Sequence, residues 1–230
     1  MKSIILSILI AFFAIPSTFS KSDCSKYYPM QEGATFQYTN YNAKGKTEGI
    51  VDYEVTEVTN NGDSTAATMA IEMKDEKGKD IYNTSYSFSC ADNKINIDYQ
   101  SLLPQSMIDQ MGDMEMEITG SDIELPNELI VGESLPDANV TMTMNMAGMN
   151  MKTEVNILNR KVETKEMVDT PAGSFDCYVI YSDSQTKTMG MNKTFPSKLW
   201  LAEGVGMVKQ ESYNQKGKLI SSTVLTALSK

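Results

Sequence analysis

Apolar and polar residues alternate in short segments along almost the whole chain. The clearest segment is residues 50–59, which places Val51, Tyr53 and Val55 on one face of an extended chain and polar side chains on the other. A period of two residues is typical of a β-strand with one buried face. Similar segments occupy residues 34–41, 68–74, 82–90, 95–99, 155–162, 175–181, 198–201, 207–213 and 219–225. The sequence therefore predicts an all-β fold.

Three connections between these segments share one pattern, which begins with Asn or Asp and has Gly in the fourth position. They are residues 42–46, 75–79 and 214–218. The pattern predicts a type I turn followed by a left-handed glycine, which closes an antiparallel hairpin. The Asn or Asp side chain caps the turn, and glycine tolerates a positive φ. Each connection also carries two lysines, so an anion-binding loop is the alternative to the solubilised hairpin turn that we favour.

Two segments depart from the strand pattern. Residues 101–112 begin with Ser101 and end with Gly112, and their apolar residues fall on one helical face. They predict one short helix near residues 103–111, which covers one face or an end of the sheet. Residues 122–137 contain two prolines and divide the chain into two β-rich halves. This crossing segment is either a domain linker or a strap across one sheet, and we favour the strap because it keeps several apolar residues.

The first twenty residues have the form of a secretory signal peptide. Lys2 supplies a positive charge, residues 4–15 form an apolar run, and small residues follow Pro16. The run is too short for a membrane-spanning helix, which needs about 20 residues. The sequence predicts a signal peptide over residues 1–20 and one β-rich domain over residues 21–230. That domain is expected in the periplasm or secreted, and not spanning a membrane.

The chain has three cysteines, Cys24, Cys90 and Cys177, none of them in a C-x-x-C pair. In an oxidising compartment, one disulfide and one free thiol is the simplest arrangement. Spacing does not choose among the three pairings. We favour Cys24–Cys90, which would attach the mature N-terminus to the sheet, with Cys177 as a small buried residue. Lys21 and Asp23 before Cys24 are untypical of a lipid-modified cysteine, so no lipid anchor is expected.

Charge and histidine content exclude several classes of function. The 230-residue chain carries a net charge of −10, so its surface repels nucleic acid. It contains no histidine, which excludes Ser-His-Asp and Cys-His catalysis and any histidine-ligated metal. No nucleotide-binding or hydrolase motif occurs. We therefore expect a non-enzymatic protein with no catalytic residue, metal or cofactor. A hydrolase built on an Asp/Glu pair is the enzymatic alternative.

Methionines recur at alternate positions in residues 140–151. They are Met142, Met144, Met146, Met149 and Met151. The first three share a strand face, and a turn at residues 147–148 would bring the last two back along a partner strand. An ordinary core face is the simplest interpretation of this methionine ladder. A pliable wall for a lipid or other apolar ligand comes second, and a thioether site for Cu(I) third. These five residues are the candidate ligand-binding residues.

Three parts of the chain resemble a known family. One is residues 166–180, which contain Thr-Pro-Ala-Gly-Ser-Phe at 170–175, and another is residues 200–209, which read Trp-Leu-Ala-Glu-Gly-Val-Gly-Met-Val-Lys. The third is Tyr-Tyr-Pro at residues 27–29, with Glu-Gly following at residues 32–33. Together they resemble the TapB-like family of exported bacterial proteins, which is related to a larger family of domains of unknown function. The resemblance implies a mainly antiparallel sheet curved into an open or half barrel, similar to the folds of periplasmic lipoprotein carriers. It implies no activity and no functional residue.

These observations predict an exported, non-enzymatic binding protein of unknown specificity. A lipid or other apolar molecule would lie on the concave face of the sheet, where the methionine ladder is one candidate wall. The alternative is a structural or envelope-assembly protein that binds another protein through the sheet edges or the same face. A methionine-based copper binder and a carboxylate hydrolase are less favoured.

Overall fold

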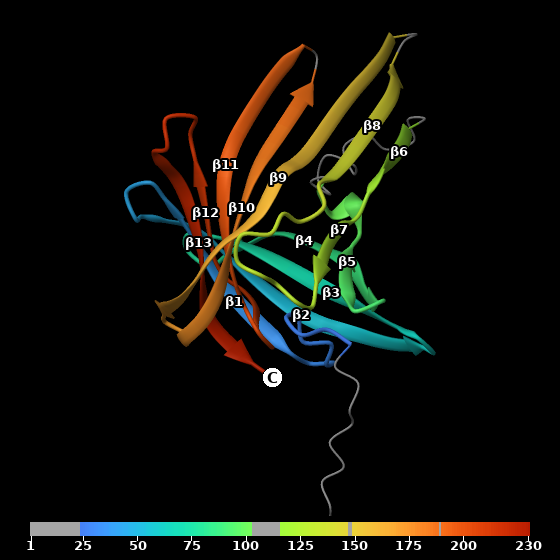
Figure 1. The fold of residues 1–230 in the computed structure, drawn as a ribbon. Coiled ribbons are helices and arrows are strands. Elements are labelled where there is room, and N and C mark those ends of the chain that lie inside the picture. Colours follow the sequence, from blue (N-terminus) through green and yellow to red (C-terminus); the bar gives the residue numbers. More distant parts are fainter. Residues whose placement is uncertain (1–23, 103–115, 147–148, 189) are drawn as a thin grey trace, which may run out of the picture.

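The computed structural model describes residues 24–102, 116–146, 149–188 and 190–230 (Figure 1). Within these residues, thirteen strands and one short 3-10 helix are present, and no helix has the length and apolar character needed to cross a membrane. The helix is η1 (Tyr99–Leu102). The strands are β1 (Thr35–Asn42), β2 (Thr47–Asn61), β3 (Ser64–Asp75), β4 (Asp80–Ala91), β5 (Lys94–Ile97), β6 (Met116–Ser121), β7 (Ile123–Pro126), β8 (Ala138–Met146), β9 (Met149–Thr170), β10 (Gly173–Thr188), β11 (Met191–Ala202), β12 (Gly206–Tyr213) and β13 (Leu219–Ser229).

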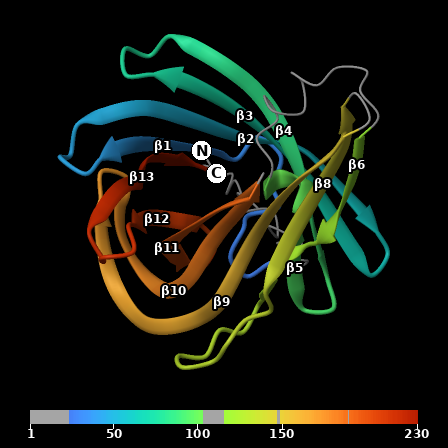
Figure 2. The same cartoon turned by 90° about the horizontal axis from the view of Figure 1, so that it is seen from above.

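All thirteen strands form one antiparallel sheet, in the order β6-β8-β9-β10-β11-β12-β13-β1-β2-β3-β4-β5-β7. The sheet curls round on itself, as the view from above shows (Figure 2). The result is a nearly closed barrel with one unsealed seam, between the two ends of the sheet. The predicted fold class, an all-β antiparallel sheet curved into an open barrel, is confirmed.

The seam lies where the chain passes from one end of the sheet to the other. Strand β6 ends at Ser121 and β7 begins at Ile123, although these strands are the two ends of the sheet. Asp122 alone connects them, and its Oδ1 accepts a hydrogen bond of 3.1 Å from the backbone N–H of Tyr99 in η1. The connecting residue is therefore fixed by the helix beside it.

The segment from Asn127 to Asp137 leads from β7 back to β8 and pairs with β9 on its way. Backbone hydrogen bonds join Gly132 N–H to the Val162 carbonyl at 2.7 Å and Leu135 N–H to the Arg160 carbonyl at 2.9 Å. The crossing segment thus connects two parts of one continuous sheet, and its Leu129 and Leu135 side chains are buried in the main core.

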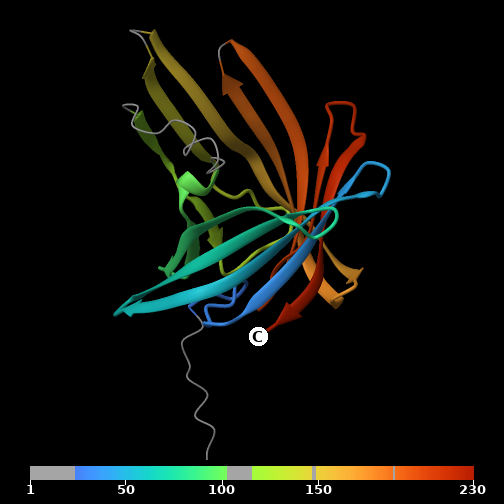
Figure 3. The ribbon, with the colours of Figure 1, turned by 180° about the vertical axis from the view of Figure 1, so that it is seen from behind.

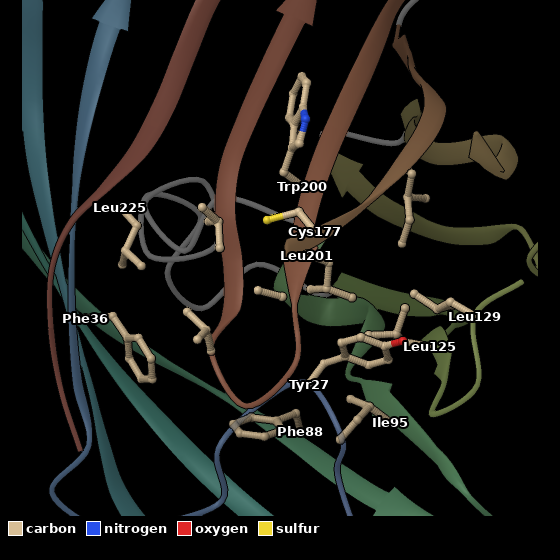
Figure 4. Close-up of a cluster of buried hydrophobic side chains, with 14 of the residues drawn as sticks. Tyr27, Phe36, Phe88, Ile95, Leu125, Leu129, Cys177, Trp200, Leu201 and Leu225 are labelled. Atoms are coloured by element: carbon tan, nitrogen blue, oxygen red, sulfur yellow. The ribbon is translucent and has the colours of Figure 1, made fainter. Parts of the chain in front are cut away.

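The main hydrophobic core brings together buried side chains from both halves of the chain, among them Phe36, Cys177 and Leu225 (Figure 4). Alternate residues of β2 show how the sequence pattern builds it. Val55 is fully buried and Val51 nearly so, whereas Asp52 binds Lys74 on the other face of the sheet. Cys177 is also fully buried and is the one free cysteine among the described residues, as predicted.

The three recurrent turns have the geometry that their sequence predicts. In each, the Asn or Asp side chain accepts two backbone hydrogen bonds from the residues two and four positions later, at 2.8 to 3.1 Å. Gly45, Gly78 and Gly217 have φ values of 74°, 81° and 72°. Only glycine adopts this left-handed conformation without a Cβ clash. The turns close the hairpins β1–β2, β3–β4 and β12–β13.

Strand lengths differ from the sequence expectation. Strand β9 covers 22 residues, whereas the alternating pattern predicts only residues 155–162. Residues 163–167 of β9 read Glu-Thr-Lys-Glu-Met, and this part of the strand pairs with β10 although it shows no alternation of apolar and polar residues. The predicted signal peptide over residues 1–20, the turn at residues 147–148 and the helix near residues 103–111 lie outside the described residues.

Candidate functional site

A cavity of about 190 Å³ lies inside the barrel and is lined mainly by aromatic side chains. Its lining residues are Tyr28, Phe36, Tyr38, Tyr53, Met69, Tyr86, Val205, Met207 and Gln210. They come from four neighbouring strands, β1 to β4, from β12 and the turn before it, and from the segment that precedes β1. We call this cavity the tyrosine chamber.

Strand register brings the tyrosines together. Phe36 on β1 is the partner of Tyr53 on β2, and Met69 on β3 is the partner of Tyr86 on β4. The rings of Tyr38 and Tyr53 pack edge to face, with centroids 5.3 Å apart and an interplanar angle of 86°. Such pairs stabilise each other beyond simple burial. The walls of the chamber are therefore held in place by the sheet itself.

The N-terminal segment carries Tyr28 into the barrel and is attached at several points. The disulfide between Cys24 and Cys90 joins this segment to β4, with 5.7 Å between the two Cα atoms, and is the pairing that we favoured. The buried Asn127 side chain accepts a hydrogen bond from Lys26 N–H at 2.8 Å and donates one to the Cys24 carbonyl at 2.5 Å. Such a structural disulfide fits a location outside the cytoplasm.

Tyr28 packs directly on the backbone of Gly206, at the start of β12. A Cβ atom at Gly206 would lie 2.9 Å from the Tyr28 ring, and Gly206 has a φ of 86°. Both observations require glycine here. The Gly-Val-Gly sequence at residues 204–206 thus forms one side of the chamber, because Val205 also lines it.

The phenol groups of the chamber stay neutral at physiological pH. Burial raises the pKa of Tyr28 to about 12, and the neighbouring Tyr53 adds to the effect, while the Arg160 cation opposes it. Burial also raises the pKa of Tyr38, Tyr53 and Tyr86. Each hydroxyl is therefore a hydrogen-bond donor as well as an acceptor.

Most of these donors have no protein partner. The Tyr38 hydroxyl donates to the carbonyl oxygen of Met207 at 2.8 Å. Within the described part of the chain, the hydroxyls of Tyr28, Tyr53 and Tyr86 form no hydrogen bond to another residue. The chamber therefore combines apolar ring faces with three hydroxyls available to an occupant, a combination typical of small-molecule sites.

The methionine ladder belongs to a different part of the barrel. Met142 and Met144 are buried, at 0% and 5% exposure, in a small cluster with Val140 on β8. Met151 and Tyr99 pack against this cluster. Strand pairing places Met146 opposite Met149, but their side chains lie outside the described residues. Met142, Met144 and Met151, the ladder residues whose side chains are described, do not line the tyrosine chamber.

One carboxylate pair lies in a surface groove. Asp52 and Glu72 are cross-strand partners on β2 and β3, at a groove of about 620 Å³ on the polar face of the sheet. Both bind the Lys74 ammonium, at 2.8 and 3.2 Å, and these two carboxylates raise the pKa of Lys74. The pair is therefore part of a surface ion-pair network. In the described ranges, no three side chains from His, Cys, Asp and Glu gather as a metal site would require.

The chain belongs to the DUF3108-like family, a family of domains of unknown function, which its residues 31–225 match. No curated protein matches the chain. Two crystal structures share the fold. One is a predicted exported protein with a YmcC-like fold from Bacteroides fragilis, at 23% identity and a TM-score of 0.71. The other is a predicted lipoprotein from Parabacteroides distasonis, at 22% identity and a TM-score of 0.73. Each comparison covers 90% of this chain and 100% of the other.

Sequence reasoning missed the tyrosine chamber. Its residues were visible as members of apolar strand faces, such as Tyr53 between Val51 and Val55. Four of the lining residues are tyrosines, and each brings a hydroxyl into an apolar interior. Tyrosines at buried strand positions are therefore the sequence feature that could have indicated this site.

Proposed function

We propose that this protein is an exported, non-enzymatic binding protein that holds a small amphipathic molecule, or one end of a larger one, in the tyrosine chamber. The observation that carries the proposal is the convergence of four tyrosines on one partly open pocket, where three of the hydroxyls bind no other residue of the described chain. Aromatic rings would contact an apolar chain, and the hydroxyls would donate to an oxygen atom of the ligand. Membership of a family of unknown function, with structural neighbours predicted to be exported or lipid-modified, is compatible with this role.

The size of the chamber limits the ligand. Its volume of about 190 Å³ is below the range of about 300–1,000 Å³ for sites that enclose drug-sized molecules. A whole phospholipid does not fit, but a short alkyl chain does. A ligand on the methionine ladder, Met142 to Met151, stays a separate proposal, because its buried members form their own cluster. Membership of the TapB-like family also stays a proposal.

The proposal is tested with a homologous series of straight-chain alcohols, from butanol to dodecanol, by isothermal titration calorimetry. Each methylene that enters the chamber contributes about 0.8 kcal/mol, or roughly a four-fold gain in affinity. We expect this gain for the first members of the series and a plateau once the chamber is full. No binding by any member would contradict the proposal.

A chamber-filling variant gives the matched control. Val205 lines the chamber and is buried, so Val205→Phe should move the plateau to shorter alcohols or abolish binding. Val131 lies in the crossing segment and is 50% exposed, so Val131→Phe should bind like the wild type. Equal affinities in the two variants would place the ligand elsewhere.

The envelope-assembly alternative rests on the two ends of the sheet. Strand β6 pairs only with β8, and β7 only with β5, among the described strands. Both strands are short, with six and four residues, and short edge strands are a common protection against pairing with another chain. We therefore favour a ligand in the barrel interior over a protein partner at the sheet edges.

A further inference from the structure

The three recurrent turns lie beside one another on one side of the barrel. They close the hairpins β12–β13, β1–β2 and β3–β4, and these six strands are consecutive in the sheet. Their tips follow one another around the same side of the molecule (Figure 3). A motif that recurs far apart in the sequence is thus gathered at one surface. Its lysines, which we call the lysine rim, are Lys44, Lys46, Lys77, Lys79, Lys216 and Lys218.

Two of the three turns in the lysine rim are positively charged, whereas the third carries as many carboxylates as lysines, and its Lys79 lowers the pKa of Asp75. All six lysines are exposed, and in the described structure none of them forms an ion pair. The turns at 42–46 and 214–218 contain no carboxylate, while the turn at 75–79 contains Asp75 and Glu76. Asp75 Oδ1 accepts backbone hydrogen bonds within its own turn. The ammonium groups therefore remain available to an external anion.

Exposed apolar side chains accompany these lysines. Ile81 follows Lys79 by two residues and is 66% exposed, and Ile220 follows Lys218 by two residues and is 38% exposed. Lys216 also borders a groove of about 560 Å³ together with Lys193 and the partly exposed Phe195 on β11. Lysines next to exposed apolar side chains are the composition of surfaces that bind the interface of a lipid bilayer.

We propose that the lysine rim docks this protein onto a bilayer that contains anionic lipids. The six ammonium groups face the lipid phosphates, and Ile81, Ile220 and Phe195 enter the headgroup region. A purely solubilising role requires neither the adjacency of the three turns nor the exposed apolar residues beside them. Lysines act additively near an anionic surface, each strengthening binding about five-fold.

The test is sedimentation of the exported protein, purified from the cell envelope without its predicted signal peptide, with large unilamellar vesicles. We expect binding to vesicles of phosphatidylcholine and phosphatidylglycerol in a 7:3 ratio at low salt, and much weaker binding at 0.5 M salt, where the Debye length falls below about 8 Å. Vesicles of phosphatidylcholine alone should bind weakly. The variant Lys46→Gln/Lys79→Gln/Lys218→Gln should lose roughly 100-fold in affinity.

The matched control removes the same charge at the opposite end of the barrel. Lys230 lies there, next to Ser229, which pairs with the first residue of β1, and Lys26 and Lys165 bind Glu203 and Asp176. The variant Lys26→Gln/Lys165→Gln/Lys230→Gln should bind within about three-fold of the wild type. Equal losses in the two variants, equal binding to neutral vesicles, or no binding to anionic vesicles would overturn the proposal. Binding of soluble polyglutamate as tight as that of the vesicles would make the rim a general polyanion site and overturn the assignment to a bilayer.

Discussion

The guanidinium of Arg160 on β9 donates a hydrogen bond of 2.9 Å to the carbonyl oxygen of Glu124 on β7, and so connects strands from the two sides of the barrel seam. The same Nη1 atom donates to the Pro136 carbonyl at 2.6 Å. Arg160 is the only arginine in the chain and is 6% exposed. A planar guanidinium that donates to two carbonyls stabilises the seam, across which the described strands β6 and β7 do not pair with each other.

Replacement of Arg160 by Met should therefore lower the free energy of unfolding. Two carbonyl groups would lose their donor, and a buried unsatisfied acceptor costs about 1–3 kcal/mol. We expect a loss of about 2–4 kcal/mol in urea unfolding, with a smaller loss for Arg160→Lys. Lys161 is the adjacent, exposed residue, so Lys161→Gln should change stability by less than about 0.5 kcal/mol. A loss for Arg160→Met no larger than that would show that the seam does not depend on this contact.

Reduction of the Cys24–Cys90 disulfide should destabilise the protein. The bridge spans 66 residues, and a loop of that length corresponds to roughly 4 kcal/mol in the chain-entropy account. Dithiothreitol should therefore lower the melting temperature of the wild type and of Cys177→Ala alike. The double variant Cys24→Ala/Cys90→Ala should melt early in either condition, and sensitivity of this variant to the reductant would be inconsistent with the pairing.

Substitutions of Met142 and Met191 distinguish a packing role of the methionine ladder from a ligand-binding role. Met142 is fully buried and Met191 is 58% exposed, and both lie on strands of the same sheet. Met142→Ala should cost about 2–5 kcal/mol in the unliganded protein, and Met191→Ala less than about 0.5 kcal/mol. If Met142→Ala instead kept full stability and lost alcohol binding, the methionine ladder would be the ligand site.

High pH should destabilise the protein through its buried tyrosines. Their pKa in the unfolded chain is about 10, and burial raises the pKa of Tyr28 to about 12 and that of Tyr53, Tyr38 and Tyr86 as well. Stability from a group with a raised pKa is fully present below pH 10 and is lost as the pH rises toward the folded pKa. Circular dichroism and absorbance at 295 nm should show unfolding and phenolate formation together between about pH 10 and 12. In the variant Tyr28→Phe, the unfolding should move to higher pH, and no movement would contradict the role of this phenol.

Local patterns predict much of this fold, because each depends on residues close in sequence. The alternation around Tyr53 identifies the buried face of β2, and a pattern of Asn or Asp, any residue, Lys and Gly identifies three hairpins. The Cys24–Cys90 pairing was favoured on the expectation that it attaches the N-terminus to the sheet, and it does so.

The remaining features depend on which strands become neighbours after the sheet closes. Tyr28 and Tyr86 are 58 residues apart in the chain and line one cavity only because the N-terminal segment enters the barrel beside β4. The partners of Arg160 are backbone carbonyl groups, so no residue type in the sequence identifies them. The full length of β9 has no local signal, because residues 163–167 are mostly polar and this part of the strand is defined by its pairing with β10.

Native mass spectrometry of the protein purified from its own cell envelope tests the central claim most directly. The wild type and Val131→Phe should carry a bound mass of a small amphipathic molecule or a lipid, and Val205→Phe should carry none. Wild-type protein that is free of any bound mass and shows no chain-length dependence with alcohols would contradict the account. The tyrosine chamber would then be part of a structural core.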